Sequence, residues 1–246
     1  MGRANDAVAR LGRWPAWQFG RQAAERLIDG LFPHRCASCG TETVAAGVCG
    51  ECFAGLTPIT GSICARCGLP FELAQPDGSV CAACLARPPR YPCARAAFVY
   101  AAVSRDLILA FKRGDRTDLA PVLATHLARV AAPLLGPDTV IVPVPLHRSR
   151  LRRRRYNQAV LLGRILAARC RRDFAAGALI RKRATPSQGG LNPSQRRRNV
   201  AGAFAVRQPR RVAGRPVVLV DDVLTTGATA NACARALMRG GILEMP

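Results

Sequence analysis

The stretch VVLVDDVLTTGATA, residues 217–230, decides the fold. Its four leading apolar residues predict a buried strand, and two adjacent acids, Asp221 and Asp222, follow that strand directly. The stretch then passes through threonines and a glycine into an alanine-rich run that predicts a helix. A strand that leads through a turn into a helix is the repeating unit of parallel α/β sheets, where ligands bind at the carboxyl ends of the strands. We therefore expect the acid pair at a ligand-binding edge.

The turn after the acid pair indicates what this edge binds. It consists of Thr225, Thr226, Gly227, Ala228 and Thr229. Its N–H and hydroxyl groups, with the N-terminus of the following helix, would hold a phosphate, and the carboxylates suit sugar hydroxyls. The predicted ligand is thus a ribose with a 5′-phosphate. A Walker B strand would need a GxxxxGK[ST] loop, which the sequence lacks. A receiver-type pocket would not need the threonine turn, and a plain helix start would leave the acid pair unexplained.

The surrounding sequence fits the same α/β architecture. The predicted strands span residues 96–103 (as a strand or hairpin arm), 139–146 and 217–220. The predicted helices span residues 106–135 (with breaks near Gly114 and Pro121), 156–172 and 228–241, where two glycines end the last one. Strands that alternate with helices in this way predict a parallel sheet with crossover connections.

Eight of the eleven cysteines form four Cys-x2-Cys pairs within residues 36–84. They are Cys36, Cys39, Cys49, Cys52, Cys64, Cys67, Cys81 and Cys84. Each pair lets two thiolates face one ion from a tight turn, and two pairs complete a closed tetrahedral zinc site. We expect consecutive pairs to share an ion, although an interleaved pairing satisfies the same spacing. Redox chemistry is the alternative, but four pairs are more than an oxidoreductase needs.

These patterns divide the chain into an N-terminal helical segment (1–30), a double zinc ribbon (31–92) and an α/β domain (93–246). Metal-binding cysteines of this density indicate a reducing, cytoplasmic compartment. No stretch is apolar for the roughly 18 residues that a membrane span needs, and no secretory pattern begins the sequence. Trp14 and Trp17 beside arginines are compatible with an interfacial membrane helix, but Pro15 favours packing of this segment on the protein itself.

The formal net charge of +22 is unevenly distributed. Residues 148–215 hold twenty of the thirty-seven Lys and Arg residues and one acid, Asp173. Such an excess indicates phosphate-bearing partners, nucleotides or nucleic acid, with solubility and arginine-rich codon usage as the plain alternative. The candidate track for single-stranded DNA consists of Arg148, Arg150, Arg152, Arg153, Arg154 and Arg155, with Tyr156 as one stacking surface. With 5% aromatic residues the chain favours backbone contacts over base stacking, and a solvated loop explains the same arginines.

The chain also resembles a known family. VVLVDDVLTTGAT is similar to the fingerprint of type I phosphoribosyltransferases, which hold phosphoribosyl pyrophosphate with Mg²⁺. The segments LFPHRCASCG, VPVPLHRSRLRRRRYNQA and RATPSQGGLNPSQRRRNVAGAF resemble the competence protein F (ComF) family, from about residue 27 to residue 241. This resemblance implies a double zinc ribbon with two structural zinc ions, joined to a type I phosphoribosyltransferase-like parallel sheet flanked by helices.

The resemblance also implies roles for individual residues. Asp221 and Asp222 would contact the ribose 2′- and 3′-hydroxyls, partly through Mg²⁺, and residues 225–229 would hold the 5′-phosphate. The pyrophosphate would lie at the loop Val144, Pro145, Leu146 and His147. The mobile catalytic loop would span residues 181–199, with Arg183, Gln188 and Arg196 as contacts. His147 is a candidate acid or base, although a histidine after a strand more often forms a structural hydrogen bond.

Two functions compete at this point. One is an enzyme that transfers phosphoribosyl to an acceptor which the sequence does not name. The other is a non-catalytic module of DNA uptake that binds single-stranded DNA, or docks a partner helicase through its zinc ribbons, and keeps the phosphoribosyl site as a sensor. Family members continue after the final helix into another strand, whereas ARALMRGG is followed here by ILEMP. We therefore expect a domain truncated at its C-terminus, with weakened activity and stability.

Overall fold

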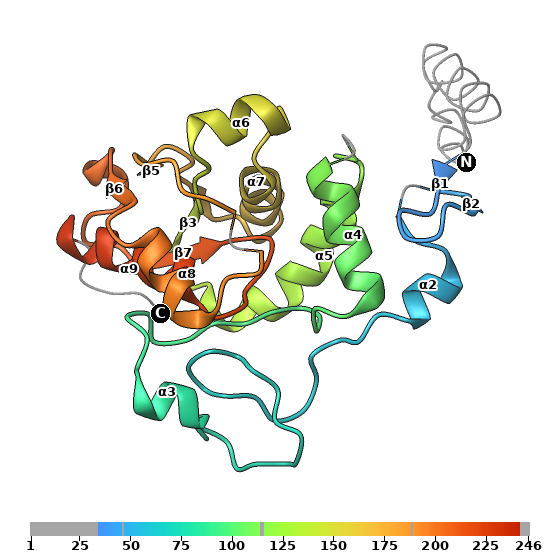
Figure 1. The fold of residues 1–246 in the computed structure, drawn as a ribbon, viewed down its shortest axis with the longest axis horizontal. Coiled ribbons are helices and arrows are strands. Elements are labelled where there is room, and N and C mark those ends of the chain that lie inside the picture. Colours follow the sequence, from blue (N-terminus) through green and yellow to red (C-terminus); the bar gives the residue numbers. More distant parts are fainter. Residues whose placement is uncertain (1–33, 46, 114–115, 188, 242–246) are drawn as a thin grey trace, which may run out of the picture.

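A parallel sheet flanked by helices follows a cysteine-rich N-terminal region (Figure 1). The computed structural model describes residues 34–45, 47–113, 116–187 and 189–241. The predicted helical segment 1–30, Gly114 and Gln188 lie outside these residues, as does the ILEMP tail. The predicted α/β class with an N-terminal zinc-ribbon module is confirmed. The domain boundaries at residues 30 and 92 stay predictions.

The sheet has the strand order β4-β3-β7, and both pairings are parallel. Its strands are β3 (Val140–Pro143), β4 (Asp173–Phe174) and β7 (Val217–Val220). Val140 pairs with Val217 and Pro143 pairs with Val220, so β3 and β7 run side by side and end together. All four residues of β3 are buried, as expected for a parallel strand that is covered on both faces.

Helices cover both faces of the sheet, and β3 divides its side chains between two hydrophobic clusters. Val140 and Val142 pack with α9 (Ala228–Arg239) in one cluster, whereas Ile141 packs with α5 (Leu119–Ala131) and α7 (Gln158–Cys170) in the other. This division follows from the alternation of side chains along a strand. α7 approaches β4 closely at a glycine, because a Cβ on Gly163 would lie 2.9 Å from the ring of Phe174.

Two local predictions before the sheet are wrong. Residues 96–103 form no strand: Phe98 makes an isolated bridge to Pro58, flanked by one hydrogen bond on each side, and α4 (Ala102–Arg113) already begins at Ala102. Pro121 does not break a helix. It lies in the first turn of α5, where backbone N–H groups have no acceptor within the helix.

The segment expected to be a mobile catalytic loop contains regular structure. β5 (Leu179–Arg181) pairs antiparallel with β6 (Phe204–Val206). Between them lies α8 (Pro193–Val200), which begins with a capping box formed by Asn192 and Gln195. The other elements are β1 (His34–Arg35), β2 (Glu42–Thr43), α2 (Gly50–Ala54), α3 (Ala82–Ala86), α6 (Arg148–Arg154) and the 3-10 turns Ala132–Leu134 and Pro209–Arg211.

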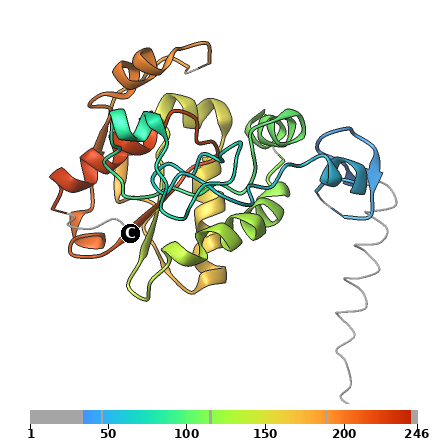
Figure 2. The same cartoon turned by 90° about the horizontal axis from the view of Figure 1, so that it is seen from below.

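The cysteine-rich region extends along one side of the α/β part. Its first half, with β1, β2 and α2, lies on the side of α4 and α5, and its second half, with α3, lies on the side of α8 and α9 (Figures 1 and 2). The two halves therefore meet different parts of the molecule. Among the described helices, none combines the length and the apolar composition that crossing a bilayer requires.

Candidate functional site

The eight paired cysteines form two tetrads. The first tetrad is Cys36, Cys39, Cys49 and Cys52, and the second tetrad is Cys64, Cys67, Cys81 and Cys84. In each tetrad the four sulfurs lie within 4.8 Å of one another, and one Sγ–Sγ distance between the two pairs is 3.7 Å. Zinc–sulfur bonds of about 2.3 Å would place thiolates about 3.8 Å apart in a tetrahedron. The tetrads thus fit two structural zinc ions, each held by consecutive pairs as expected.

The two tetrads repeat the same local hydrogen bonds. In each, the sulfur of the first cysteine accepts the backbone N–H of the third at 3.3 Å. Gly40 and Gly68 each donate their N–H at 2.9 Å to the carbonyl oxygen of that first cysteine. Both glycines have a φ in the left-handed region, near +79° and +71°, which favours glycine at this turn. The cysteine-rich region is therefore an internal repeat of one metal-binding unit.

The pKa values of the tetrad cysteines indicate that each tetrad can bind a cation. Burial opposes ionisation of Cys64, but the backbone N–H groups of Cys67, Cys81 and Arg66 outweigh it and lower the pKa of Cys64 to about 6. Burial, followed by the neighbouring thiols, raises the pKa of Cys84 far above its ordinary value. Within a tetrad one thiol thus ionises readily, whereas additional thiolates would repel the first one. A divalent ion at the centre removes this conflict.

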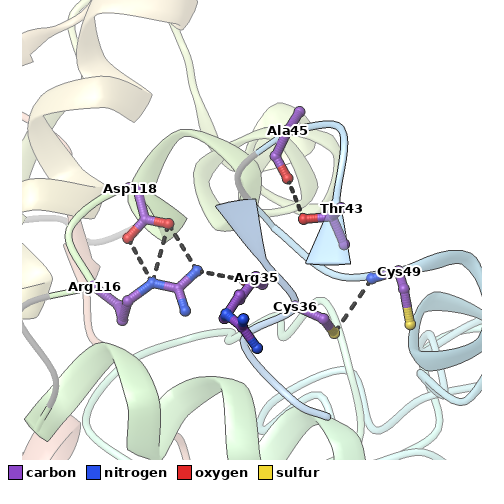
Figure 3. A network of polar contacts seen from close by, with 7 residues as sticks. All are labelled: Arg35, Cys36, Thr43, Ala45, Cys49, Arg116 and Asp118. Atoms are coloured by element: carbon purple, nitrogen blue, oxygen red, sulfur yellow. Dashed lines mark hydrogen bonds and ion pairs between the residues drawn. The ribbon is translucent and has the colours of Figure 1, made fainter. Parts of the chain in front are cut away.

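Arg116 connects the first tetrad to the start of α5 (Figure 3). Its guanidinium donates to both carboxylate oxygens of Asp118, at distances between 2.9 and 3.2 Å. The same guanidinium donates to the carbonyl oxygen of Arg35 at 3.0 Å, directly before Cys36. The first tetrad is therefore held against the helical side of the molecule.

The β3–β7 register brings the two predicted ligand loops together. β3 leads into residues 144–147, and β7 leads into Asp221 and Asp222. The N–H of Val144 donates to the carbonyl oxygen of Val220 at 2.9 Å, so the pairing continues to the last residue before the acids. The predicted pyrophosphate loop and the predicted ribose loop are thus neighbours at one edge of the sheet.

The loop after β3 is anchored at both ends. Val144 and Pro145 are buried, and Asn157 donates from Nδ2 to the carbonyl oxygen of Val144 at 3.0 Å. His147 is the N-cap of α6: its Nδ1 accepts the N–H of Ser149 at 3.3 Å and lies 2.8 Å from Oγ of that serine. Nδ1 of His147 is therefore used in a structural hydrogen bond. A role for this residue as acid or base stays a prediction.

The acid pair has a counter-ion that the sequence did not reveal. Nζ of Lys112 in α4 lies 3.2 Å from Oδ2 of Asp222, and both side chains are at least four-fifths buried. Lys112 is one of only two lysines in a chain that otherwise uses arginine. A compact ammonium can approach one carboxylate oxygen without the space that a guanidinium needs. The rarity of lysine is the one feature of the sequence that draws attention to Lys112. Its position beside Asp222 depends on the tertiary fold and could not be predicted from local sequence.

Asp221 retains a proton more easily than an ordinary aspartate. Burial of the carboxyl, together with the charge of Asp222, raises the pKa of Asp221 to about 7. The N–H of Asp222, which donates to Oδ1 of Asp221 at 2.9 Å, acts in the opposite direction but does not cancel the rise. The residue also exposes surface to solvent, which screens part of the effect. The charge of Asp222 raises this pKa more than Lys112 lowers it, so Lys112 offsets only part of the negative charge at the pair.

The turn after the acids leads into the N-terminus of α9. Gly227 is the N-cap, with a φ of +66°, while Thr225 and Thr226 are exposed, Ala228 is buried and Thr229 is half-buried. Arg196 of α8 donates from Nη1 to Oγ1 of Thr225 at 2.8 Å. A helix N-terminus, threonine hydroxyls and a guanidinium meet here, and all three favour an anion. The contact joins Arg196 of the predicted catalytic loop to the predicted phosphate turn.

The other candidates for catalytic contacts have different positions. Arg183 donates from Nη2 to the carbonyl oxygens of Asn199 and Ala201, at 3.0 and 2.8 Å, so it binds the C-terminal end of α8. Gln188 lies outside the described residues. Arg150, predicted as part of the arginine track, instead donates to the carbonyl oxygens of Thr185 and Pro186, both at 2.7 Å. α6 therefore holds the beginning of the segment 185–199.

Two groups of arginines face outward. On α6 and its C-cap, Arg152, Arg153 and Arg155 are exposed, and Arg154 donates to Oε1 of Gln158 at 3.3 Å. A second group lines a hollow between α8 and α9, formed by Arg197, Arg235 and Arg239 around Asn231 and small apolar residues. No ion pair is found for these three arginines within the described part of the chain. The predicted arginine track is thus helical, and a second basic surface lies elsewhere.

The fold and the tetrads define the class of protein: an α/β protein with an N-terminal double zinc ribbon. A family model described as "Double zinc ribbon domain" matches residues 27–85. "DNA utilization protein YhgH" of Escherichia coli (strain K12) is 35% identical over 201 residues, which are 79% of this chain and 86% of the relative. The chain therefore belongs to the family of this protein and of competence protein F.

Two further relatives carry competence names. "Competence protein F" of Haemophilus influenzae (strain Rd) is 36% identical over 124 residues, 50% of this chain and 54% of the relative. "Competence protein ComFC" of Bacillus subtilis (strain 168) is 27% identical over 201 residues, 79% of each chain. The resemblance seen in the sequence is confirmed at the level of the family.

Metal analysis tests the two tetrads separately. The protein purified with zinc should contain about two ions per chain, because each tetrad offers four thiolates at tetrahedral spacing. Cys36→Ser/Cys39→Ser and Cys64→Ser/Cys67→Ser should each contain about one ion. Cys170→Ser, a change outside both tetrads, should leave two. A single ion in the unmodified protein would contradict the assignment.

Asp221→Asn should stabilise the folded protein at alkaline pH. The folded state favours the protonated carboxyl, so ionisation destabilises the fold above the folded pKa of about 7 and not below the ordinary value of 3.8. With solvent screening, we expect the variant to exceed the wild type by on the order of 1 kcal/mol in free energy of unfolding at pH 8. The difference should vanish toward pH 4. Urea unfolding at both pH values measures it, with Asp138→Asn as the control, and a less stable Asp221→Asn protein at pH 8 would refute the assignment.

Proposed function

We propose that this protein binds phosphoribosyl pyrophosphate with Mg²⁺ at the carboxyl ends of β3 and β7. The observation that carries the proposal is the register of these strands, which places residues 144–147 beside the acid pair and the phosphate turn. Two adjacent carboxylates at such an edge repel each other and lower stability, so a ligand is needed to account for them. Sugar hydroxyls and a 5′-phosphate supply that ligand.

Each part of the ligand has a group to receive it. Asp221 and Asp222 would accept hydrogen bonds from the ribose hydroxyls. The turn 225–229, with Arg196 beside it, would hold the 5′-phosphate at the N-terminus of α9. The pyrophosphate would lie at the loop 144–147.

The acid pair also fits a bound Mg²⁺. The carboxylates of Asp221 and Asp222 are the hard oxygen ligands that this ion prefers, and Lys112 alone leaves their charge incompletely offset. Mg²⁺ would neutralise charge that develops on the departing pyrophosphate. Lys112 would then hold the carboxylate of Asp222 in position from the α4 side. Without the ion, Lys112 offsets part of the same charge.

The corresponding reaction is the transfer of phosphoribosyl to an acceptor. The bond between the anomeric carbon and the pyrophosphate oxygen breaks, and a bond from the acceptor to the same carbon forms. Arginines at the site would stabilise the leaving group, and closure of the segment 185–199 would exclude water. Because Arg150 holds the beginning of this segment and Arg196 within it contacts Thr225, both are suited to control that closure.

Calorimetric titration of phosphoribosyl pyrophosphate and Mg²⁺ into the zinc-loaded protein tests this function. Removal of both carboxylates should abolish measurable binding, because each charged hydrogen bond contributes about 1.5–3 kcal/mol. The comparison is Asp221→Asn/Asp222→Asn against Asp106→Asn/Asp138→Asn, which removes two acids outside the edge. Circular dichroism establishes that both variants are folded. A folded wild-type protein that does not bind the ligand would overturn the proposal.

A second function, the handling of single-stranded DNA during uptake, is supported by the relatives and the arginine surfaces. The relatives are named for DNA utilization and for competence. Helical arginines of α6 and the hollow between α8 and α9 both offer contacts to phosphates. A reduced, cytoplasmic setting suits the free thiols of the zinc ribbons. The ribbons are then also candidates to dock a helicase of the uptake machinery.

Three matched double variants separate these surfaces. Each removes two positive charges: Arg152→Gln/Arg153→Gln on α6, Arg235→Gln/Arg239→Gln on α9, and Arg105→Gln/Arg129→Gln on α4 and α5 as the control. Fluorescence anisotropy with an oligodeoxythymidine over a range of salt concentrations gives affinity and salt slope. A surface that binds the strand should lose about 0.7 of slope per phosphate contact removed. Equal losses in all three variants would mean attraction by net charge alone, and would refute a specific surface.

A further inference from the structure

Tyr91 lies against the turn that precedes α9. Its side chain is buried, with 7% of the residue exposed. Its hydroxyl oxygen approaches Gly227 so closely that a Cβ added there would lie 2.4 Å away. The preceding residue, Arg90, donates its backbone N–H at 2.7 Å to Oδ1 of Asn231 in the first turn of α9. Arg90 and Tyr91 thus contact the beginning of α9, which follows directly on the turn proposed to bind phosphate (residues 225–229, the phosphate turn).

The same segment is packed against the second tetrad. A Cβ on Gly68, which follows Cys67, would lie 2.4 Å from the carbonyl oxygen of Ala94. Arg95 donates from Nη1 at 3.3 Å to the carbonyl oxygen of Ala65, which lies inside the first Cys-x2-Cys pair of this tetrad. The second tetrad is also close enough that, after burial, its thiolates contribute to raising the pKa of Tyr91 to about 12. The segment 90–95 therefore contacts Gly227 through Tyr91 and the second tetrad through Ala94 and Arg95.

The first tetrad has no such connection among the described residues. Its contacts lead to α5, through Arg116 and Arg35, and through Val122, which a Cβ on Gly47 would meet at 3.6 Å. The two tetrads have the same internal hydrogen bonds, but only the second has Tyr91 beside it. Loss of zinc from the first tetrad is therefore a control for any effect that zinc in the second tetrad has on the phosphate turn.

We propose that Tyr91 is a positioning residue that makes the phosphate turn depend on zinc in the second tetrad and not in the first. A zinc ribbon has little core, so its metal supplies most of its folding free energy. Loss of zinc from the second tetrad removes the surface behind Tyr91, and Gly227 then loses the contact that holds its left-handed conformation. The consequence for ligand binding rests on the proposed function, whereas the consequence for the mobility of the turn does not.

Hydrogen exchange of the full-length protein tests the coupling without any ligand. The readout is the backbone exchange of peptides that cover residues 223–231. In Cys64→Ser/Cys67→Ser we expect exchange about tenfold faster than in the wild type, and in Cys36→Ser/Cys39→Ser we expect a change of less than about twofold. Equal effects of the two variants, or no effect of the first, would overturn the proposal.

A second pair of variants leaves both tetrads intact. In Gly227→Ala the new Cβ meets the hydroxyl of Tyr91, but in Tyr91→Phe/Gly227→Ala the nearest ring atom would lie at an ordinary 3.5 Å. The double variant should therefore exchange more slowly at residues 223–231 than Gly227→Ala alone, with two zinc ions in each. A remaining difference from the wild type reflects the φ of +66°, which alanine rarely adopts. If Tyr91→Phe does not slow exchange in the Gly227→Ala protein, the contact does not position the turn and the proposal fails.

Titration of phosphoribosyl pyrophosphate with Mg²⁺ then separates the two proposals. We expect the second-tetrad variant to bind at least about tenfold more weakly than the first-tetrad variant. If the two bind equally and the wild type binds, the inference about Tyr91 is wrong and the proposed function stands. If the folded wild type does not bind, the proposed function is wrong, and the exchange experiments alone decide the role of Tyr91.

Discussion

The parallel pairing of β3 with β7 is the constraint on which the candidate site depends. Val140 pairs with Val217 and Pro143 with Val220, so two loops that are about 75 residues apart in sequence begin at the same edge. The hydrogen bond from Val144 to Val220 extends the pairing to the last residue before the acids. A shift of one residue would move the acid pair relative to residues 144–147 and would exchange the faces on which Val140 and Ile141 pack. The hydrophobic clusters on both faces therefore fix the geometry of the site.

The edge of the sheet is negatively charged, whereas the chain as a whole is strongly positive. The protein has a formal charge of +22, yet its sheet ends in two adjacent carboxylates with one lysine, Lys112, opposite them. A buried Arg181 lies nearby, with burial lowering its pKa to about 10, and its Nε has no hydrogen-bond partner among the described residues. Groups of both signs are thus held in place with their interactions incomplete. Such an arrangement lowers stability and suits a ligand that carries both hydroxyls and phosphates.

The sequence predicted the parts of this molecule that local chemistry determines. Cysteine spacing alone indicates the two tetrads, because the ligand geometry of zinc is strict, and an apolar run followed by two acids indicates β7 and its edge. It did not predict Lys112 or Tyr91, nor that Arg150 binds residues 185 and 186, since these roles arise only when distant segments meet. The strand expected at residues 96–103 is reduced to one bridge at Phe98, because the chain already enters α4 at Ala102. Local patterns thus indicated the metal ligands and the turn proposed to bind phosphate, and tertiary packing supplied the residues that contact them.

The most direct test of the account is a crystal structure of the zinc-loaded protein grown with Mg²⁺ and phosphoribosyl pyrophosphate. We expect one ligand across the ends of β3 and β7, with the ribose hydroxyls at Asp221 and Asp222 and the 5′-phosphate at residues 225–229. The pyrophosphate should lie at residues 144–147, with two zinc ions in the tetrads. A ligand bound elsewhere, or bound at this edge without contact to either acid, would contradict the central claim.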